Sequence, residues 1–163
     1  MIEKIGTNAG LVWHALEAGK LELKAIKKAT KLTEKEIYAA TYAWFTQVGE
    51  EEVVGLLGEQ SITTHNLKVG DYCGISVCSK EQKDVALYIG DTHSNEVDKL
   101  LGLPYFVDST GAITLKGSKV TMIAKVVDII HLQGIEADSL VYFKVVEYHE
   151  NEKLDYLLMN DIR

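Results

Sequence analysis

The clearest hydrophobic pattern in the chain lies between Thr33 and Gly49. Thr33, followed three positions later by Glu36, is typical of a capping box at the start of a helix. Gly49 can adopt the left-handed conformation that often ends one. Between them, mostly apolar residues recur at the spacing of one helix face: Ile37, Ala40, Thr41, Trp44, Phe45 and Val48. The pattern predicts a helix over residues 33–49 with one buried face.

Two shorter helices are predicted before it, the first from about Thr7 or Asn8 to Ala18 and the second over residues 24–30. The short interval between the second and third helices is typical of a helix-turn-helix. The β-prone runs at 53–57 and 60–64 then predict a hairpin, the wing of such a domain. We therefore predict a winged helix-turn-helix domain over residues 1–63.

Three segments of this region carry a family resemblance: GTNAGLVWHAL at 6–16, LKAIKKA at 23–29, and LT at 32–33 followed by YAA at 38–40. They resemble a family of short bacterial winged helix-turn-helix domains of unknown function. The resemblance covers residues 1 to about 63. It implies the fold and a place among transcription-associated proteins, and it brings no catalytic residues.

Two surfaces of this domain are candidate binding sites. Five lysines on or beside the second helix can contact phosphates: Lys24, Lys27, Lys28, Lys31 and Lys35. A solvated helix face is the favoured explanation, because the third helix is acidic and Arg163 is the only arginine for guanine readout. Tyr38 and Tyr42, four positions apart, are candidate anchors for a protein. The expected partners are double-stranded DNA, bound weakly, or a protein.

From residue 66 onward the pattern changes to short β-rich runs separated by turns. A short helix is predicted between Asn95 and Gly102, and residues 154–162 fit either a strand or a helix. Strands are predicted at 71–77, 85–89, 105–107, 112–115, 120–130 and 140–148. The predicted fold class is therefore α+β: a winged helix-turn-helix domain, then a mainly antiparallel, small barrel-like β domain over residues 66–163 with one short helix.

Composition narrows the classes of protein. The 163 residues carry a net charge of −7, which weighs against strong non-specific binding of nucleic acid. No apolar run approaches the roughly 18–20 residues of a membrane helix, and no secretory signal is visible, so we expect a cytoplasmic protein without membrane contact. Cys73 and Cys78 are five positions apart and would face opposite sides of one strand, so no disulfide between them is expected.

The predicted β domain contains no clear sequence motif for catalysis. The polar run at residues 91–98 contains carboxylates and His93, but its spacing matches no metal motif. Cys78 as a nucleophile would need a nearby base. We therefore predict no catalytic residues, no metal and no cofactor. The hypothesis is a non-catalytic regulatory or adaptor protein, with dimerisation or partner contact through the β domain; the alternative is a small metal-dependent or thiol enzyme with its site there.

Overall fold

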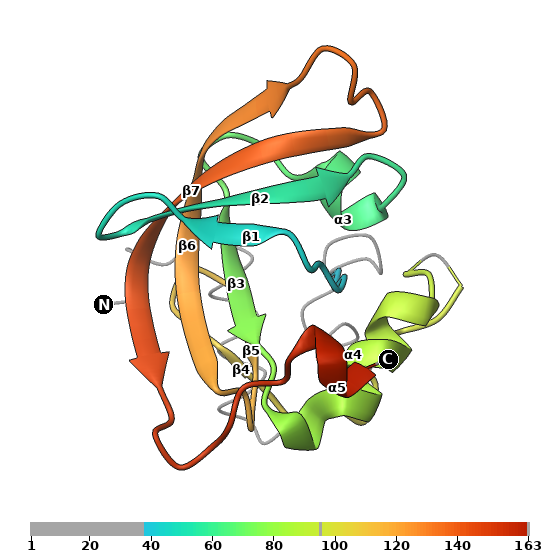
Figure 1. Cartoon of the computed structure of the whole chain (residues 1–163), viewed down its shortest axis with the longest axis vertical. Helices are drawn as coiled ribbons and strands as arrows, with labels where there is room; N and C mark the ends of the chain where they lie inside the picture. Colours follow the sequence, from blue (N-terminus) through green and yellow to red (C-terminus); the bar gives the residue numbers. More distant parts are fainter. Residues whose placement is uncertain (1–37, 95, 163) are drawn as a thin grey trace.

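The computed structural model describes residues 38–94 and 96–162. Its main feature is an antiparallel five-stranded sheet in the order β1-β2-β7-β6-β3. The strands are β1 (Phe45–Gln47), β2 (Glu52–Gly58), β3 (Tyr72–Val77), β6 (Val120–His131) and β7 (Asp138–Glu150). Figure 1 shows the long β6 and β7 at the centre of this sheet. The predicted antiparallel β domain is confirmed at this level.

A two-stranded hairpin, β4 (Tyr105–Val107) and β5 (Ile113–Leu115), lies beside β3. The backbone N–H of Leu115 donates to Ser76 Oγ at 2.9 Å. The hairpin turn is held by Asp108, whose Oδ1 accepts from the backbone N–H groups of Thr110 and Ala112 at 2.9 Å each. This hairpin was predicted from its turn residues, and the prediction is confirmed.

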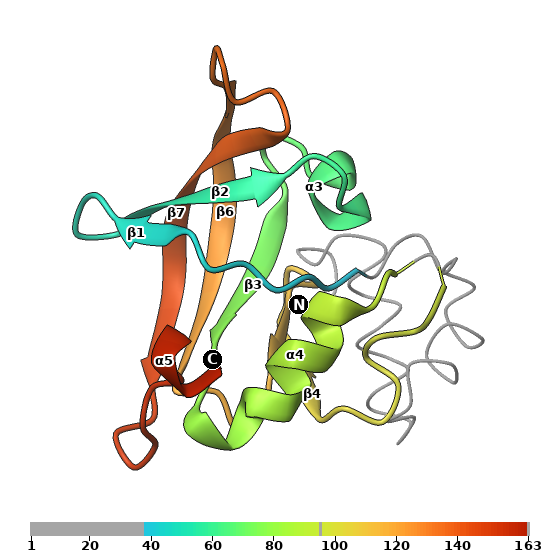
Figure 2. The same ribbon diagram turned by 45° about the vertical axis from the view of Figure 1, so that its right-hand side comes forward.

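Helical segments are short. They are α3 (Ile62–Asn66), the 3₁₀ turn η3 (Lys80–Gln82), α4 (Lys83–Asp91) and α5 (Met159–Ile162). Figures 1 and 2 place α5 near the end of the sheet opposite α3. Within the described ranges, no helix is long and apolar enough to cross a membrane.

The hydrophobic core lies on one face of the central strands. Alternate residues of β7 point into it, as expected for period-two packing, and Val141 and Phe143 are 0% and 1% exposed. Phe45 of β1 stacks on Phe143 with ring centroids 5.9 Å apart. Leu57, Ala124 and Val126 complete the fully buried cluster.

The helix predicted over residues 33–49 is wrong where the structure can be compared with it, from residue 38 to 49. This stretch is extended and contains β1, which pairs with β2. Trp44, expected in a helix core, is 74% exposed. Packing of Phe45 against the sheet overrides the local helical periodicity. The two earlier predicted helices lie outside the described residues.

Three further elements differ from the sequence predictions. The second strand of the expected wing is α3, and β2 pairs with β7 instead. The strand predicted at 85–89 lies in α4, because a Ser79–Gln82 capping box starts a helical segment there. The short helix expected near 95–102 is a series of turns in its described part. Lys99 from these turns donates to the carbonyl of Ile89 at 2.8 Å and so caps α4.

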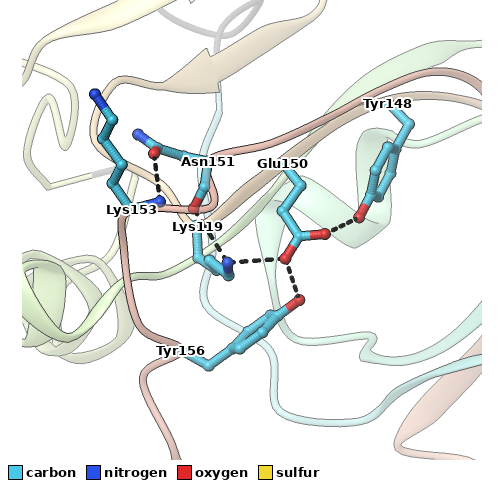
Figure 3. Close-up of polar contacts among 6 residues, drawn as sticks. All are labelled: Lys119, Tyr148, Glu150, Asn151, Lys153 and Tyr156. Carbon is cyan, nitrogen blue, oxygen red and sulfur yellow. Dashed lines mark hydrogen bonds and ion pairs between the residues drawn. The ribbon is translucent and has the colours of Figure 1, made fainter.

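A polar cluster fastens the C-terminal segment to the sheet, as Figure 3 shows. The buried Lys119 places Nζ 2.8 Å from Glu150 Oε1 and donates to the Asn151 carbonyl at 3.1 Å. Tyr148 and Tyr156 donate to the same carboxylate at 2.9 and 3.1 Å. These hydrogen bonds, above all the one from Lys119, lower the pKa of Glu150, and the bond to Glu150 raises the pKa of Lys119.

The close approach of β5 to β3 predicts that Gly74→Ala destabilises the protein. A Cβ on Gly74 would lie 1.8 Å from the Ile113 carbonyl oxygen, so backbone must move, at a cost of roughly 2–3 kcal/mol. Urea unfolding measures this loss. The control is Gly90→Ala on α4, where a Cβ meets Thr41 at an ordinary 3.5 Å and helix propensity should add about 0.5–1 kcal/mol. A Gly74→Ala protein of wild-type stability would contradict this packing.

The polar cluster predicts a pH-dependent contribution to stability. Because the folded-state pKa of Glu150 is lowered, its contribution is present above the unfolded-state pKa and is lost as pH falls through the folded-state value. Glu150→Gln should therefore be less stable than wild type at neutral pH, and the two should converge in acid. Urea midpoints across a pH series measure this. Glu147→Gln, an exposed change on the same strand, should track wild type throughout.

Candidate functional site

A cavity of about 250 Å³ lies where β2 ends and the β6–β7 hairpin begins. Its apolar wall is formed by Leu67, Ile129 and Val141. Its polar lining comes from the segment after β2, from α3 and from the last residue of β6: Glu59, Thr64, His65 and His131. Figure 1 shows α3 beside the end of β2, which brings these three segments together.

Strand register places a three-residue polar group at this cavity. Ser139 pairs with Leu57 of β2 on one side and with His131 of β6 on the other. Its fully buried hydroxyl donates to Glu59 Oε1 and lies 3.0 Å from His131 Nδ1. Since the only hydroxyl proton goes to Glu59, His131 must donate from Nδ1 in the second bond. His131 Nδ1 is also 3.4 Å from Glu59 Oε1, so protonation of the ring would create an ion pair.

A group of hydroxyls forms the second polar part of the site. Tyr42 donates to Ser61 Oγ at 3.0 Å, and its oxygen lies 2.7 Å from Thr64 Oγ1. With the Tyr42 proton given to Ser61, Thr64 is the donor in the second bond and keeps lone pairs for a ligand. Thr63 Oγ1, next in the chain, is buried without a hydrogen-bond partner among the described residues. An unpaired buried hydroxyl costs about 1–3 kcal/mol. Thr63 is not among the residues that line the cavity.

The geometry does not favour the metal or thiol chemistry considered from the sequence. Over residues 38–94 and 96–162, no group of three or more His, Cys, Asp or Glu side chains is arranged to hold a metal ion. Burial raises the pKa of Cys73 to about 12, with Asp71 adding to the effect, and burial also raises the pKa of Cys78. Both free thiols are therefore protonated at neutral pH and poorly nucleophilic.

Of the candidate binding residues chosen from the sequence, the structure describes only the two tyrosines. The candidate nucleic-acid strip, Lys24, Lys27, Lys28, Lys31 and Lys35, lies outside the described residues. Tyr38 is half-buried. Tyr42 is half-buried too, packs against the core cluster and directs its hydroxyl into the site. Their proposed contact with a protein stays a prediction.

Sequence reasoning missed the residues that form the cavity. Ser61, Thr63 and Thr64 were assigned to a wing strand over residues 60–64, which hid their grouping with His65 at α3. His131 and Ser139 flank the turn between the two longest predicted strands, and this was the available signal. Glu59, by contrast, is 80 positions from its partner Ser139, a pairing that no local pattern reveals.

Comparison with known proteins bears on both parts of the chain. A model of a winged helix-turn-helix domain family matches residues 1–47, which confirms the family resemblance but over a shorter stretch than the predicted residues 1 to about 63. No curated protein matches the chain.

Solved structures similar to this chain have flavin-related names. The NADH:FAD oxidoreductase SgcE6 of Streptomyces globisporus C-1027 has a TM-score of 0.66 at 16% identity, covering 75% of this chain and 73% of that one. The FMN-binding protein of Thermus thermophilus has a TM-score of 0.64 at 20% identity, covering 71% and 65%. The styrene monooxygenase flavin reductase of Pseudomonas putida S12 has a TM-score of 0.59 at 16% identity, covering 71% and 72%. At these identities the likeness shows a shared fold.

A model of the flavin reductase like domain matches residues 28–163, which include the whole β domain that the sequence analysis left unassigned. This match overturns the prediction of a non-catalytic regulatory or adaptor protein, and with it the assignment to transcription regulation and DNA binding. The chain belongs to the flavin reductase like domain family.

Proposed function

We propose that the protein binds a flavin and acts as an oxidoreductase that takes electrons from a reduced nicotinamide cofactor. The observation that carries the proposal is the family match over residues 28–163, on a sheet whose end holds a polar cavity. The names of two similar structures, an NADH:FAD oxidoreductase and a flavin reductase, support the reaction class. The proposal replaces the earlier expectation that no cofactor is used.

The cavity fits one part of a flavin, its hydroxyl-bearing ribityl chain. Thr64 and Glu59 offer acceptors, and His65 and His131 offer ring nitrogens. The volume of about 250 Å³ is below the roughly 300–1,000 Å³ typical of pockets that enclose a drug-sized ligand. A cavity of this size would hold only part of a flavin.

Flavin, once bound, would supply hydride and one-electron transfer chemistry. The residues of the chain would bind and orient it. Thr64 is fixed by Tyr42, and Glu59 is fixed by Ser139, so both acceptors are held in place before a ligand arrives. Leu67, Ile129 and Val141 exclude water from one wall, which strengthens the hydrogen bonds made inside.

The proposal is tested by adding riboflavin, FMN or FAD to the purified full chain. We expect binding, seen as a change in flavin fluorescence, and oxidation of NADH or NADPH faster than with free flavin alone. Absence of both binding and enhanced oxidation with all three flavins would overturn the proposal.

The cavity lining predicts that a substitution of His65 weakens flavin binding with little effect on stability. Its side chain lines the cavity but the residue is exposed, so His65→Ala should cost little stability. Loss of one ligand hydrogen bond should weaken flavin binding by about five- to tenfold. The dissociation constant from fluorescence titration measures this, with thermal unfolding as the check on folding. His149→Ala, an exposed histidine of β7 outside the cavity, is the matched control and should bind as wild type does.

A further inference from the structure

The cavity at the end of β2 contains a carboxylate that is held in a fixed position. Glu59 lines this cavity, and its side chain is 34% exposed. Its Oε1 accepts the proton of the fully buried Ser139 and lies 3.4 Å from His131 Nδ1. Its Oε2 has no hydrogen-bond partner among residues 38–94 and 96–162. One oxygen thus fixes the carboxylate, and the other keeps its full capacity to accept hydrogen bonds.

Two further groups of the lining are left as acceptors. Because Tyr42 gives its proton to Ser61, the buried Thr64 must donate to Tyr42, and its hydroxyl keeps only lone pairs for a ligand. His131 donates from Nδ1 to Ser139, so Nε2 of the neutral ring is an acceptor. Together with Oε2 of Glu59, the lining therefore offers three unused acceptors.

The rest of the described lining adds no compensating positive charge. It contains no lysine or arginine, and Lys68, close by in the chain, is exposed and does not line the cavity. The opposite character is supplied by the apolar wall of Leu67, Ile129 and Val141. A complementary ligand must therefore bring hydrogen-bond donors and positive charge at one end and apolar surface at the other.

We infer that the cavity binds a small primary amine in its protonated form. An alkylammonium group carries three N–H donors and one positive charge, which match the three acceptors and the one carboxylate. The carbon body of the amine would lie against the apolar wall. The volume of about 250 Å³ is sufficient, since an apolar cavity of about 150 Å³ holds benzene. This inference goes beyond the proposed function and does not depend on it.

Calorimetric titration of the full chain with three probes that share one ring tests the inference. The probes are benzylamine, which is cationic, benzyl alcohol, which is neutral, and benzoate, which is anionic. Benzylamine should bind with one site per chain and at least tenfold more tightly than benzyl alcohol, because hydrogen bonds between charged groups are the stronger ones. Benzoate should not bind, because Glu59 repels it. A flavin group in the cavity would compete with the amine, so no flavin is added.

A charge-removing variant assigns the binding to this carboxylate. Glu59→Gln keeps an oxygen for Ser139 but removes the charge, so benzylamine should bind about tenfold more weakly while benzyl alcohol changes little. Glu147→Gln, the same charge change on the exposed part of β7, should bind benzylamine as wild type does. Thermal unfolding checks that both variants are folded. A crystal structure of the wild-type protein with benzylamine gives the same assignment without a variant, because its nitrogen should lie within hydrogen-bond distance of Glu59.

The salt dependence of the wild-type protein is an independent measurement. Added sodium chloride should weaken the binding of benzylamine by screening its attraction to Glu59, and should leave benzyl alcohol unchanged.

The outcomes separate this inference from the proposed function. Absence of saturable benzylamine binding, equal affinity for benzyl alcohol, an unchanged affinity in folded Glu59→Gln, or a bound nitrogen away from Glu59 would overturn the inference. None of these results bears on flavin binding or on the oxidation of NADH, which are measured separately.

Discussion

The pairing of β7 with both β2 and β6 is the constraint on which the rest of the structure depends. Val141 and Phe143 of β7 are buried only in this register, because a slip by one residue would turn every side chain to the opposite face. The same register determines which residues become neighbours at the two ends of the β6–β7 hairpin. It places Ser139 between Leu57 and His131 at one end, and Glu150 opposite Val120, next to Lys119, at the other.

These two ends carry polar groups of different character. At the C-terminal end, Lys119, Tyr148 and Tyr156 converge on Glu150, so donors and acceptor satisfy one another. At the cavity end, Ser139 and His131 both lie at one oxygen of Glu59, and the other oxygen has no partner among the described residues. A satisfied cluster fixes structure, whereas unsatisfied capacity beside a cavity is what a ligand uses.

Residues 28–47 belong to both family matches, which makes this stretch the junction of the two parts of the chain. In its described part, residues 45–47 form β1, at the edge of the five-stranded sheet. Two patterns overlap here: Phe45 fits the predicted buried helix face, and it also fits a strand, where its ring stacks on Phe143. The pairing of β1 with β2 and the packing of Phe45 against the core favour the strand.

The sequence by itself determined the elements whose signals are local. β3, β6 and β7 follow from their β-rich runs, and the β4–β5 hairpin follows from its Asp108 turn, because period-two alternation and turn chemistry act within a few residues. Only the tertiary structure decided that Phe45 lies in a strand and Ile89 in a helix, since each segment satisfies two periodicities until a partner buries one face. It also decided the site: Glu59, His131 and Ser139 become neighbours through strand register, which is set by contacts between distant residues.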